Sequence, residues 1–235
     1  MLLMEKMGND IEMQIKIRKF TDGDIHGVMD VLTDAAFSHI WPGFLLTVKK
    51  RAFQLFSLLL PTVIYLLTWS EWIFIYTFVA CYCVVYVFNL TVALVYVHGP
   101  PLTDMKCVLR NYFDNTNSCF WVAENVDVDR SMQIVGTIAI VNKNHGHYVN
   151  TEAWLRRMAV HRKFRGKGIA GRLIETAIDF CVEQNYKTIC LITTEVHVQA
   201  RQLYRKYGFT CTGYRPIFYL KGLVPIWTFE FEKYL

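Results

Sequence analysis

A long apolar stretch, from Ala52 to Val97, is the feature that most constrains the fold of this chain of 235 residues. Its only charged residue is Glu71, which stands with Ser70 at the midpoint, where a turn between two helices would fall. About 20 apolar residues suffice for one membrane-spanning helix, so the stretch is long enough for two. The sequence therefore predicts a transmembrane helical hairpin over residues 49–99.

Aromatic residues near this midpoint agree with a membrane setting. Trp69, Trp72 and Tyr76 cluster there, as aromatic side chains do at the interface of a bilayer. The alternative is a helical hairpin buried in a soluble domain, and the near absence of charge disfavours it.

The chain before the apolar stretch predicts a strand followed by a helix. Met13, Ile15 and Ile17 alternate with polar residues, which is typical of a half-buried strand. Thr21 then stands where a helix N-cap belongs. Residues 1–10 are expected to form a flexible tail without a cleavable signal.

A basic turn containing two glycines is the second constraint. Residues 165–170 read R-G-K-G-I-A, after an apolar strand end at Met158–Val160 and before a helix with apolar residues at helical spacing. Gly166 and Gly168 lack a Cβ, so the backbone can approach a ligand closely. A helix N-terminus has unpaired N–H groups and partial positive charge, which suits a phosphate. The turn predicts a pyrophosphate cradle; an ordinary strand–helix connection is the alternative.

Two spaced motifs resemble those of one enzyme superfamily. Residues 165–170 resemble the coenzyme A signature of the GNAT acetyltransferases, and residues 200–209, A-x-x-L-Y-x-x-x-G-F, resemble a stretch that closes the same fold. The apolar stretch and residues 119–124, C-F-W-V-A-E, make the chain similar to the camello-like branch, the membrane-bound N-acetyltransferase family eight. The resemblance covers about residues 13–20 and 103–235.

The resemblance implies an α/β (α+β) fold with a mixed central sheet and helices on both faces, interrupted by the transmembrane hairpin. Residues 11–48 would supply the first strand and helix, and residues 100–235 the coenzyme A-binding and catalytic part. The first strand must pair with strands that follow the hairpin, so both ends of the hairpin are expected on one side of the membrane. Basic residues 49–51 place that side in the cytosol. We therefore expect a multi-pass protein with two spans, in the endoplasmic reticulum, whose catalytic domain faces the cytosol.

The resemblance also implies the activity and its donor: an N-acetyltransferase that moves an acetyl group from acetyl-CoA to a primary amine. The backbone of Met158 and Val160 would hold the pantetheine arm and polarise the thioester carbonyl, and both residues can also be plain core strand. His197 would bind the pantetheine or relay a proton, with a helix-start cap as the alternative. The residues expected to bind the coenzyme are Met158, Val160, Arg165, Gly166, Lys167, Gly168, Ile169, Ala170 and His197.

Three residues are the candidates for the general acid and the general base. Tyr204 matches the tyrosine that commonly protonates the coenzyme A thiolate in this superfamily; a tyrosine packed under the sheet is the alternative. For the general base the candidates are Glu152 and Glu124, each of which can also be a surface carboxylate.

The acceptor is the least constrained part of the prediction. Camello-like proteins carry a histidine where this chain has Arg157, which leaves room for an acceptor whose carboxylate the arginine binds bidentately. Cysteine S-conjugates or other amphiphilic amines are expected. The alternatives are protein lysines or peptide amines at the endoplasmic reticulum membrane, and a catalytically silent acetyl-CoA-binding protein.

Composition limits the other partners. The net charge of +5 fits an anionic cofactor or a lipid bilayer, and no motif indicates nucleic acid. The seven cysteines are scattered without a C-x-x-C or a paired cysteine–histidine spacing, so no metal site is expected.

Overall fold

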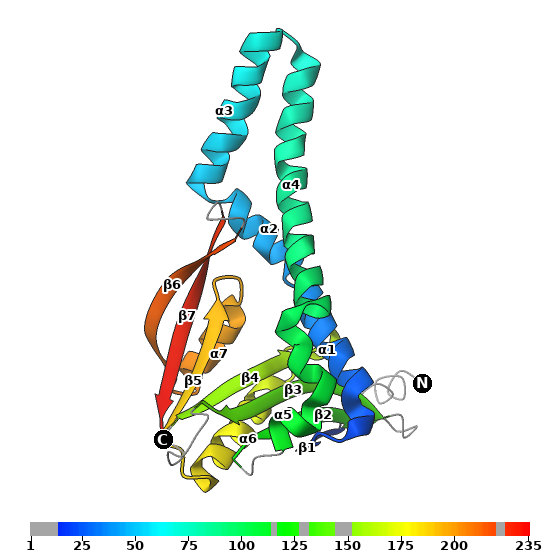
Figure 1. Cartoon of the computed structure of the whole chain (residues 1–235), viewed down its shortest axis with the longest axis vertical. Helices are drawn as coiled ribbons and strands as arrows, with labels where there is room; N and C mark the ends of the chain where they lie inside the picture. The colour runs from blue at the N-terminus through cyan, green and yellow to red at the C-terminus, as the bar shows by residue number, and fades with distance from the viewer. Residues whose placement is uncertain (1–13, 114–116, 127–131, 144–151, 220–223) are drawn as a thin grey trace, which may run out of the picture. The chain divides into compact units, whose positions relative to one another are not determined.

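The computed structural model describes residues 14–113, 117–126, 132–143, 152–219 and 224–235 (Figure 1). The predicted tail over residues 1–10 and Met13 lie outside these ranges. The chain forms two compact units. The first combines Met1–Asp34 with Asp104–Leu235, and the second comprises Ala35–Thr103.

The first unit is built on a seven-stranded sheet with the order β1-β2-β3-β4-β5-β7-β6. Its β4–β5 pair is parallel and the other pairs are antiparallel, so the predicted mixed sheet is confirmed. The strands are β1 (Gln14–Lys19), β2 (Cys119–Val126), β3 (Met132–Asn142), β4 (Glu152–Val160), β5 (Thr188–Thr194), β6 (Thr210–Tyr219) and β7 (Val224–Tyr234).

The first strand joins the sheet across the whole apolar stretch, as predicted. Arg18 of β1 pairs with Val122 of β2, and the antiparallel ladder runs along the full length of β1. Both ends of the apolar stretch are therefore joined to one sheet.

Helices cover both faces of this sheet. On one face the Phe120 ring packs edge-on against Phe20 and Tyr112, at 5.5 Å and 5.2 Å between ring centroids. The next residue, Trp121, packs against Phe180 on the other face. The helical segments of this unit are η1 (Asp22–Asp24), α1 (Ile25–Phe37, which runs into the second unit), η2 (Pro100–Cys107, which starts in the second unit), α5 (Val108–Phe113), η3 (Arg162–Phe164), α6 (Ile169–Glu183) and α7 (Val198–Lys206).

The predicted helix after the glycine turn is α6, and its apolar stripe forms the centre of the core. Leu173, Ala177 and Cys181 have no exposed surface. The same core continues through Tyr204 of α7 and Phe231 of β7. It fixes the start of α6, and hence the glycine turn, against the sheet.

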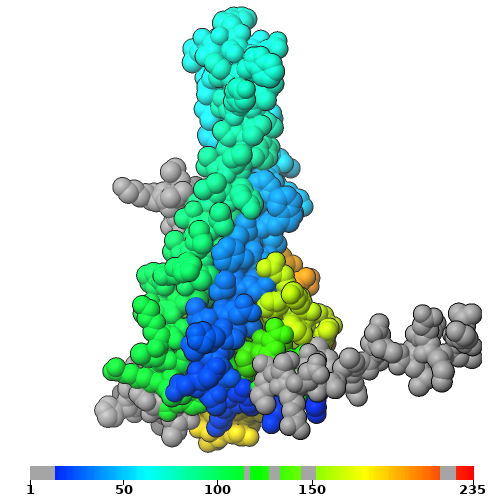
Figure 2. Space-filling view, turned by 90° about the vertical axis from the view of Figure 1, so that its right-hand side faces the viewer, coloured from blue at the N-terminus to red at the C-terminus, as the bar shows by residue number. Residues whose placement is uncertain are grey.

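The second unit consists of α2 (Ile40–Val48), α3 (Arg51–Thr68) and α4 (Glu71–His98). Helices α3 and α4 are the two halves of the predicted hairpin, and Trp69 takes a left-handed conformation (φ 51°) in the turn between them. Figure 2 shows this unit with α4 in front of α3. The two helices are in contact, since the rings of Phe53 and Tyr82 meet edge-on with their centroids 5.2 Å apart.

Helix α2 is not evident from the sequence. Its residues include Pro42-Gly43, a pair that normally marks a turn. Here the proline lies in the first helical turn, where its missing N–H has no partner to lose.

Three helical segments of the described chain are long and apolar enough to cross a membrane, judged by length and composition: residues 22–48, 51–68 and 71–113. The sequence predicts two spans, which correspond to the second and third segments. The first segment includes α1, whose Asp34 is buried.

Candidate active site

The strands β4 and β5 separate after a short contact. They pair at only three positions, from Glu152 with Thr188 to Trp154 with Cys190. Beyond Trp154 no pairing of β4 with β5 is found, whereas β5 stays paired with β7 as far as Thr194. We call the region beyond Trp154 and Cys190 the β4–β5 gap. It leaves the backbone of Met158 and Val160 without the neighbouring strand that a continuous sheet would supply.

A bulge in β4 accounts for this separation. The register between β3 and β4 shifts between Thr137 and Ala139, and Arg157 has a positive φ of 54°. The Thr137 hydroxyl donates a hydrogen bond of 2.7 Å to the Arg157 carbonyl oxygen, which secures this conformation. A bulge bends its strand and increases the local twist, so it directs the end of β4 away from β5.

The glycine turn, predicted as a pyrophosphate cradle, lies at the end of β4. Gly166 and Gly168 have positive φ angles of 80° and 76°, and a Cβ at either position would meet nothing within 4 Å. Helix α6 begins at Ile169 and presents its first N–H groups to this open space. Arg165 donates from Nε to the Val160 carbonyl oxygen at 3.0 Å, which ties the turn to the strand end. Open space, unpaired N–H groups and basic side chains fit a pyrophosphate.

We expect Gly168→Asp to weaken acetyl-CoA binding by more than tenfold, or about 1.4 kcal/mol, because it places a carboxylate beside the pyrophosphate. Gly168→Ala is the matched control, since it adds the same strain at positive φ without the charge. Calorimetry on both folded variants measures the difference. Equal affinities for the two would contradict a phosphate at this position.

Tyr204, the predicted general acid, is buried in the core of the first unit. Its ring packs against Phe209 and Phe231. Burial raises the pKa of the Tyr204 hydroxyl above its usual range, so it stays protonated at neutral pH. Among the described residues its hydroxyl has no hydrogen-bond partner. A protonated, uncommitted hydroxyl can donate to a departing thiolate.

His197 stands between the end of β5 and the start of α7. Its Nδ1 lies 3.2 Å from Thr193 Oγ1 and 3.1 Å from Thr194 Oγ1, and its side chain makes no helix-capping hydrogen bond. Burial, together with the positive charges of Arg201 and Arg165, lowers the pKa of His197 to about 4. A neutral imidazole at the end of β5 suits a hydrogen bond to the pantetheine better than a charged role.

Glu152 lies at the wrong end of β4 for a general base. It pairs in register with Thr188, where β4 and β5 are still joined, and forms a salt bridge of 2.6 Å to Lys143. The bulge at Arg157 is five residues further along the strand, roughly 16 Å at about 3.3 Å per residue. This position argues against the predicted role as a base.

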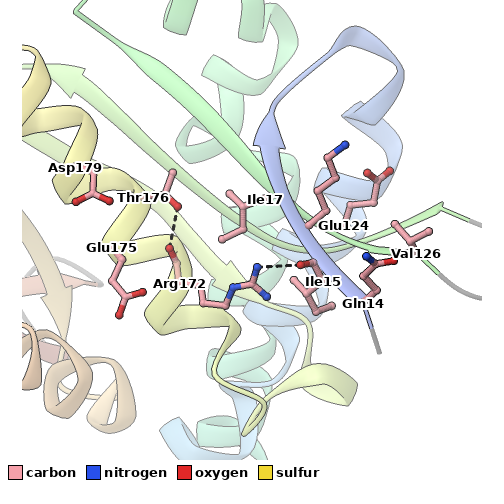
Figure 3. A pocket seen from close by; sticks show the side chains of 10 residues that line it. Gln14, Ile15, Ile17, Glu124, Val126, Arg172, Glu175, Thr176 and Asp179 are labelled. Atoms are coloured by element: carbon pink, nitrogen blue, oxygen red, sulfur yellow. Dashed lines mark hydrogen bonds between the residues drawn. The ribbon is translucent and has the colours of Figure 1, made fainter. Parts of the chain in front are cut away.

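The Glu124 side chain, the other candidate base, points toward Arg18. Its carboxylate accepts two hydrogen bonds from Arg18, at 3.0 Å and 3.1 Å, and Arg18 also binds Asp24. Strand β3 separates β2 from β4, which puts roughly 10 Å between them. Figure 3 shows Glu124 lining a cavity of about 750 Å³ beside β1, where Arg172 donates to the Ile15 carbonyl oxygen. Glu124 is therefore part of a buried ion network remote from the β4–β5 gap.

An ion pair that the sequence does not predict lies at the bulge. Arg157 binds Asp104 bidentately, at 2.5 Å from Nη2 and 3.0 Å from Nε, and the Tyr112 hydroxyl donates to the same carboxylate. The Arg157 side chain is 7% exposed. Burial works against ionisation of Asp104, but the hydrogen bonds from Arg157 and Tyr112 outweigh it and hold the pKa of Asp104 below its usual value. The departure from the family histidine at position 157 was the only signal in the sequence.

No group of three metal-ligating side chains is found within the residues that the structure describes.

Solved acetyltransferases share this fold. A putative phosphinothricin N-acetyltransferase superposes with a TM-score of 0.58 at 12% identity, covering 94% of this chain and 99% of that one. A putative acetyltransferase from Acinetobacter baylyi gives 0.59 at 14% identity, with 96% and 94% covered. The fold is thus that of an acetyltransferase.

The sequence comparisons identify the family. The model of the Acetyltransferase (GNAT) family matches residues 90–209, and this chain belongs to that family. Curated relatives include N-acetylaspartate synthetase of Danio rerio, 31% identical over 89% of this chain and 72% of the relative. N-acetyltransferase 8B of Homo sapiens is 27% identical over 93% and 94%. The resemblance to the camello-like, family-eight branch is confirmed, and the prediction that the chain is an N-acetyltransferase is confirmed with it. Enzymes of this family take the acetyl group from acetyl-CoA.

Proposed function

We propose that this chain is a membrane-anchored N-acetyltransferase whose acceptor is a small amine that also carries a carboxylate. The observation that carries the proposal is the placement of Arg157 at the β4 bulge, directly before Met158. The guanidinium is the natural partner of a carboxylate, and its neighbour is expected to hold the thioester.

Backbone N–H groups of the glycine turn bind the pyrophosphate of acetyl-CoA, and the pantetheine arm lies in the β4–β5 gap. The acceptor amine attacks the thioester carbonyl carbon, and the backbone at Met158 and Val160 stabilises the developing oxyanion. The C–S bond then breaks, the amine nitrogen gives its proton to water, and Tyr204 donates its proton to the leaving thiolate. The Tyr204 phenolate regains a proton from solvent before the next turnover. The products are the acetylated amine and coenzyme A.

The charges at the bulge favour an anionic acceptor. Arg156, whose guanidinium lies 5.5 Å from the centre of the Trp154 ring, is near enough to lower the pKa of Asp104 together with Arg157. Asp104 is hydrogen-bonded to only one of these two arginines, Arg157, and one carboxylate offsets the charge of one guanidinium, so the three side chains together carry a net positive charge. Asp104 fixes the orientation of Arg157, and a substrate carboxylate adds the second negative charge.

This acceptor class includes the cysteine S-conjugates expected from the sequence, and also aspartate. A cysteine S-conjugate and aspartate each carry an amine and a carboxylate on one carbon. N-acetylaspartate synthetase, one of the relatives, is named for a product of this kind. A lysine side chain within a protein has no carboxylate at this distance from its amine.

Release of coenzyme A from acetyl-CoA tests the proposal with a panel of amines. Amino acids and cysteine S-conjugates are compared with their carboxamides, which keep the amine and remove the charge. We expect the carboxamides to react at least about tenfold more slowly, the equivalent of about 1.4 kcal/mol. Faster reaction of lysine peptides would instead favour a protein acetyltransferase. Binding of acetyl-CoA without any turnover would favour a catalytically silent binding protein.

The hydrogen bonds within α3 and α4 support the membrane anchor. A bilayer core offers no water, so polar groups there must be satisfied within the helix. The hydroxyl groups of Thr62 and Thr91 donate to the carbonyl oxygens four residues earlier, at 2.8 Å and 2.9 Å. Thr68, Thr77 and Asn89 donate in the same way, and Ser57 donates to the carbonyl oxygen three residues earlier. Large apolar side chains cover the rest, such as Leu67 at 78% exposed.

We expect tags at both termini to be digested by protease added to intact microsomes, and a tag inserted at Ser70 to be protected until detergent is added. The reason is that β1 and β2 belong to one sheet, so the hairpin between them must return to its starting side. Protection of the N-terminal tag alone would contradict the pairing of β1 with β2. Digestion of the Ser70 tag would show a hairpin that does not reach the lumen, which would remove the two spans.

A further inference from the structure

The last two strands extend beyond the rest of the sheet as a two-stranded ribbon. Strand β5 pairs with β7 only as far as Thr194 with Thr228. The β6–β7 ladder continues past this point, from Pro216 with Trp227 to Tyr219 with Val224. Figure 1 shows β6 and β7 running on together past the end of β5. We call residues 216–219 and 224–227 the ribbon end.

The ribbon end is apolar by sequence, and two of the residues whose side chains the structure describes there are exposed. All eight of its residues are apolar or aromatic. Ile217 is 44% exposed and Trp227 37% exposed, and Tyr214, whose ring lies 5.7 Å from that of Trp227, is 70% exposed. A two-stranded ribbon is marginally stable in water, so exposed apolar residues on it indicate a further contact.

The exposed apolar residues occupy both faces of the ribbon. Residues paired across an antiparallel ladder share a face, and successive residues alternate. Ile217 pairs with Ile226 and lies on one face, while Trp227 pairs with Pro216 and lies on the other. A single protein partner docked on one face would leave the other in water, whereas a lipid environment surrounds both.

We propose that the ribbon end lies in the interfacial region of the bilayer, as a second membrane contact in addition to the helical hairpin. The inference rests on the proposed membrane anchor, which holds the catalytic unit close to the lipid at both ends of the hairpin. Tryptophan and tyrosine are enriched at this depth, where one end of the side chain is apolar and the other is wet. The open backbone edges of the ribbon require hydrogen-bonding partners and exclude the hydrocarbon centre, so headgroups and interfacial water satisfy them.

A second copy of the chain, added edge to edge on β6, is the main competing occupant. Pro216 disfavours it, because a proline in the edge strand has no N–H to donate to another strand. Edge pairing would also leave the apolar faces exposed.

The contact would bring the membrane to the β4–β5 gap. The Glu195 N–H donates to the Trp227 carbonyl oxygen at 2.8 Å, which joins the ribbon to the loop that precedes His197. An amphiphilic acceptor could thus leave the bilayer next to the coenzyme.

The test uses spin labels on the full chain in vesicles of phosphatidylcholine and phosphatidylserine. Exposed Cys83, Cys107 and Cys211 are first replaced by serine. Labels are then attached at Ile217→Cys and, as the matched control on the same strand, at the exposed Thr212→Cys. Collisions with oxygen, which concentrates in lipid, should exceed those with a water-soluble nickel complex at position 217, and the order should reverse at position 212.

A label at Val84→Cys on α4, where the native side chain is 67% exposed, tests the membrane anchor separately from the ribbon contact. If position 84 is in lipid and position 217 collides with nickel as often as position 212, the ribbon contact is wrong and the anchor stands. If position 84 is also in water, the membrane anchor itself is wrong. Spin–spin broadening between labels at position 217, with low collision rates for both oxygen and nickel, would show that a second copy of the chain covers the ribbon end. The lipid contact would then be wrong. Retained acetyl-CoA binding verifies that each labelled variant is folded.

Discussion

Asp104→Asn is expected to destabilise the catalytic unit by about 3–5 kcal/mol, because it leaves a buried guanidinium without its counter-ion. The Arg157 side chain is 7% exposed, and within the described part of the chain Asp104 binds it bidentately. Such a loss is a large part of the total stability of a typical domain. Thermal inactivation of the detergent-solubilised protein measures it, and exposed Asp179→Asn on α6 is the control that should change little.

The acid dependence of stability gives this variant a second signature. The pKa of Asp104 is lower in the folded chain than the unfolded value of about 3.9. Its contribution is therefore complete above about pH 4 and is lost as the pH falls through the folded pKa. Asp24 and Asp34 also have lowered pKa values and act in the same sense. Wild type should lose stability more steeply below pH 4 than Asp104→Asn does; parallel curves would show that the ion pair contributes nothing.

The elements that could be predicted from the sequence are those with a local signal. The alternation at Ile15 and Ile17 marked β1, and the glycine turn marked both the end of β4 and the start of α6. Each of these patterns depends on residues close together in the chain. The hairpin was visible because charge is almost absent from one long stretch.

The residues that could not be predicted depend on strand register and on distant partners. Asp104 and Arg157 are 53 residues apart in the chain and meet because the β4 bulge turns the arginine toward the segment before α5. Glu124 and Glu152 were chosen as bases because they lie on strands of the sheet. Alternation shows which face a residue takes, but it does not show that Arg18 neutralises Glu124 or that β4 and β5 are still paired at Glu152.

Tyr204→Phe should lower kcat by about 10²- to 10⁴-fold, the usual contribution of a general acid, with little change in affinity for acetyl-CoA. The change removes one hydroxyl, and the packing of the ring on Phe209 and Phe231 is kept. Tyr207→Phe is the matched control, because its hydroxyl donates to Glu175 at the surface, at 2.8 Å.

The identity of the leaving group distinguishes an acid from a residue that only packs. A donor whose thiol has a low pKa, such as an aryl thioester analogue of acetyl-CoA, needs no proton when the C–S bond breaks. If Tyr204 is the acid, this donor should restore most of the kcat lost in Tyr204→Phe while leaving wild type nearly unchanged. An equal deficit with both donors would mean that the tyrosine supports the site only through packing. Full activity with acetyl-CoA itself would mean that water protonates the thiolate in the β4–β5 gap.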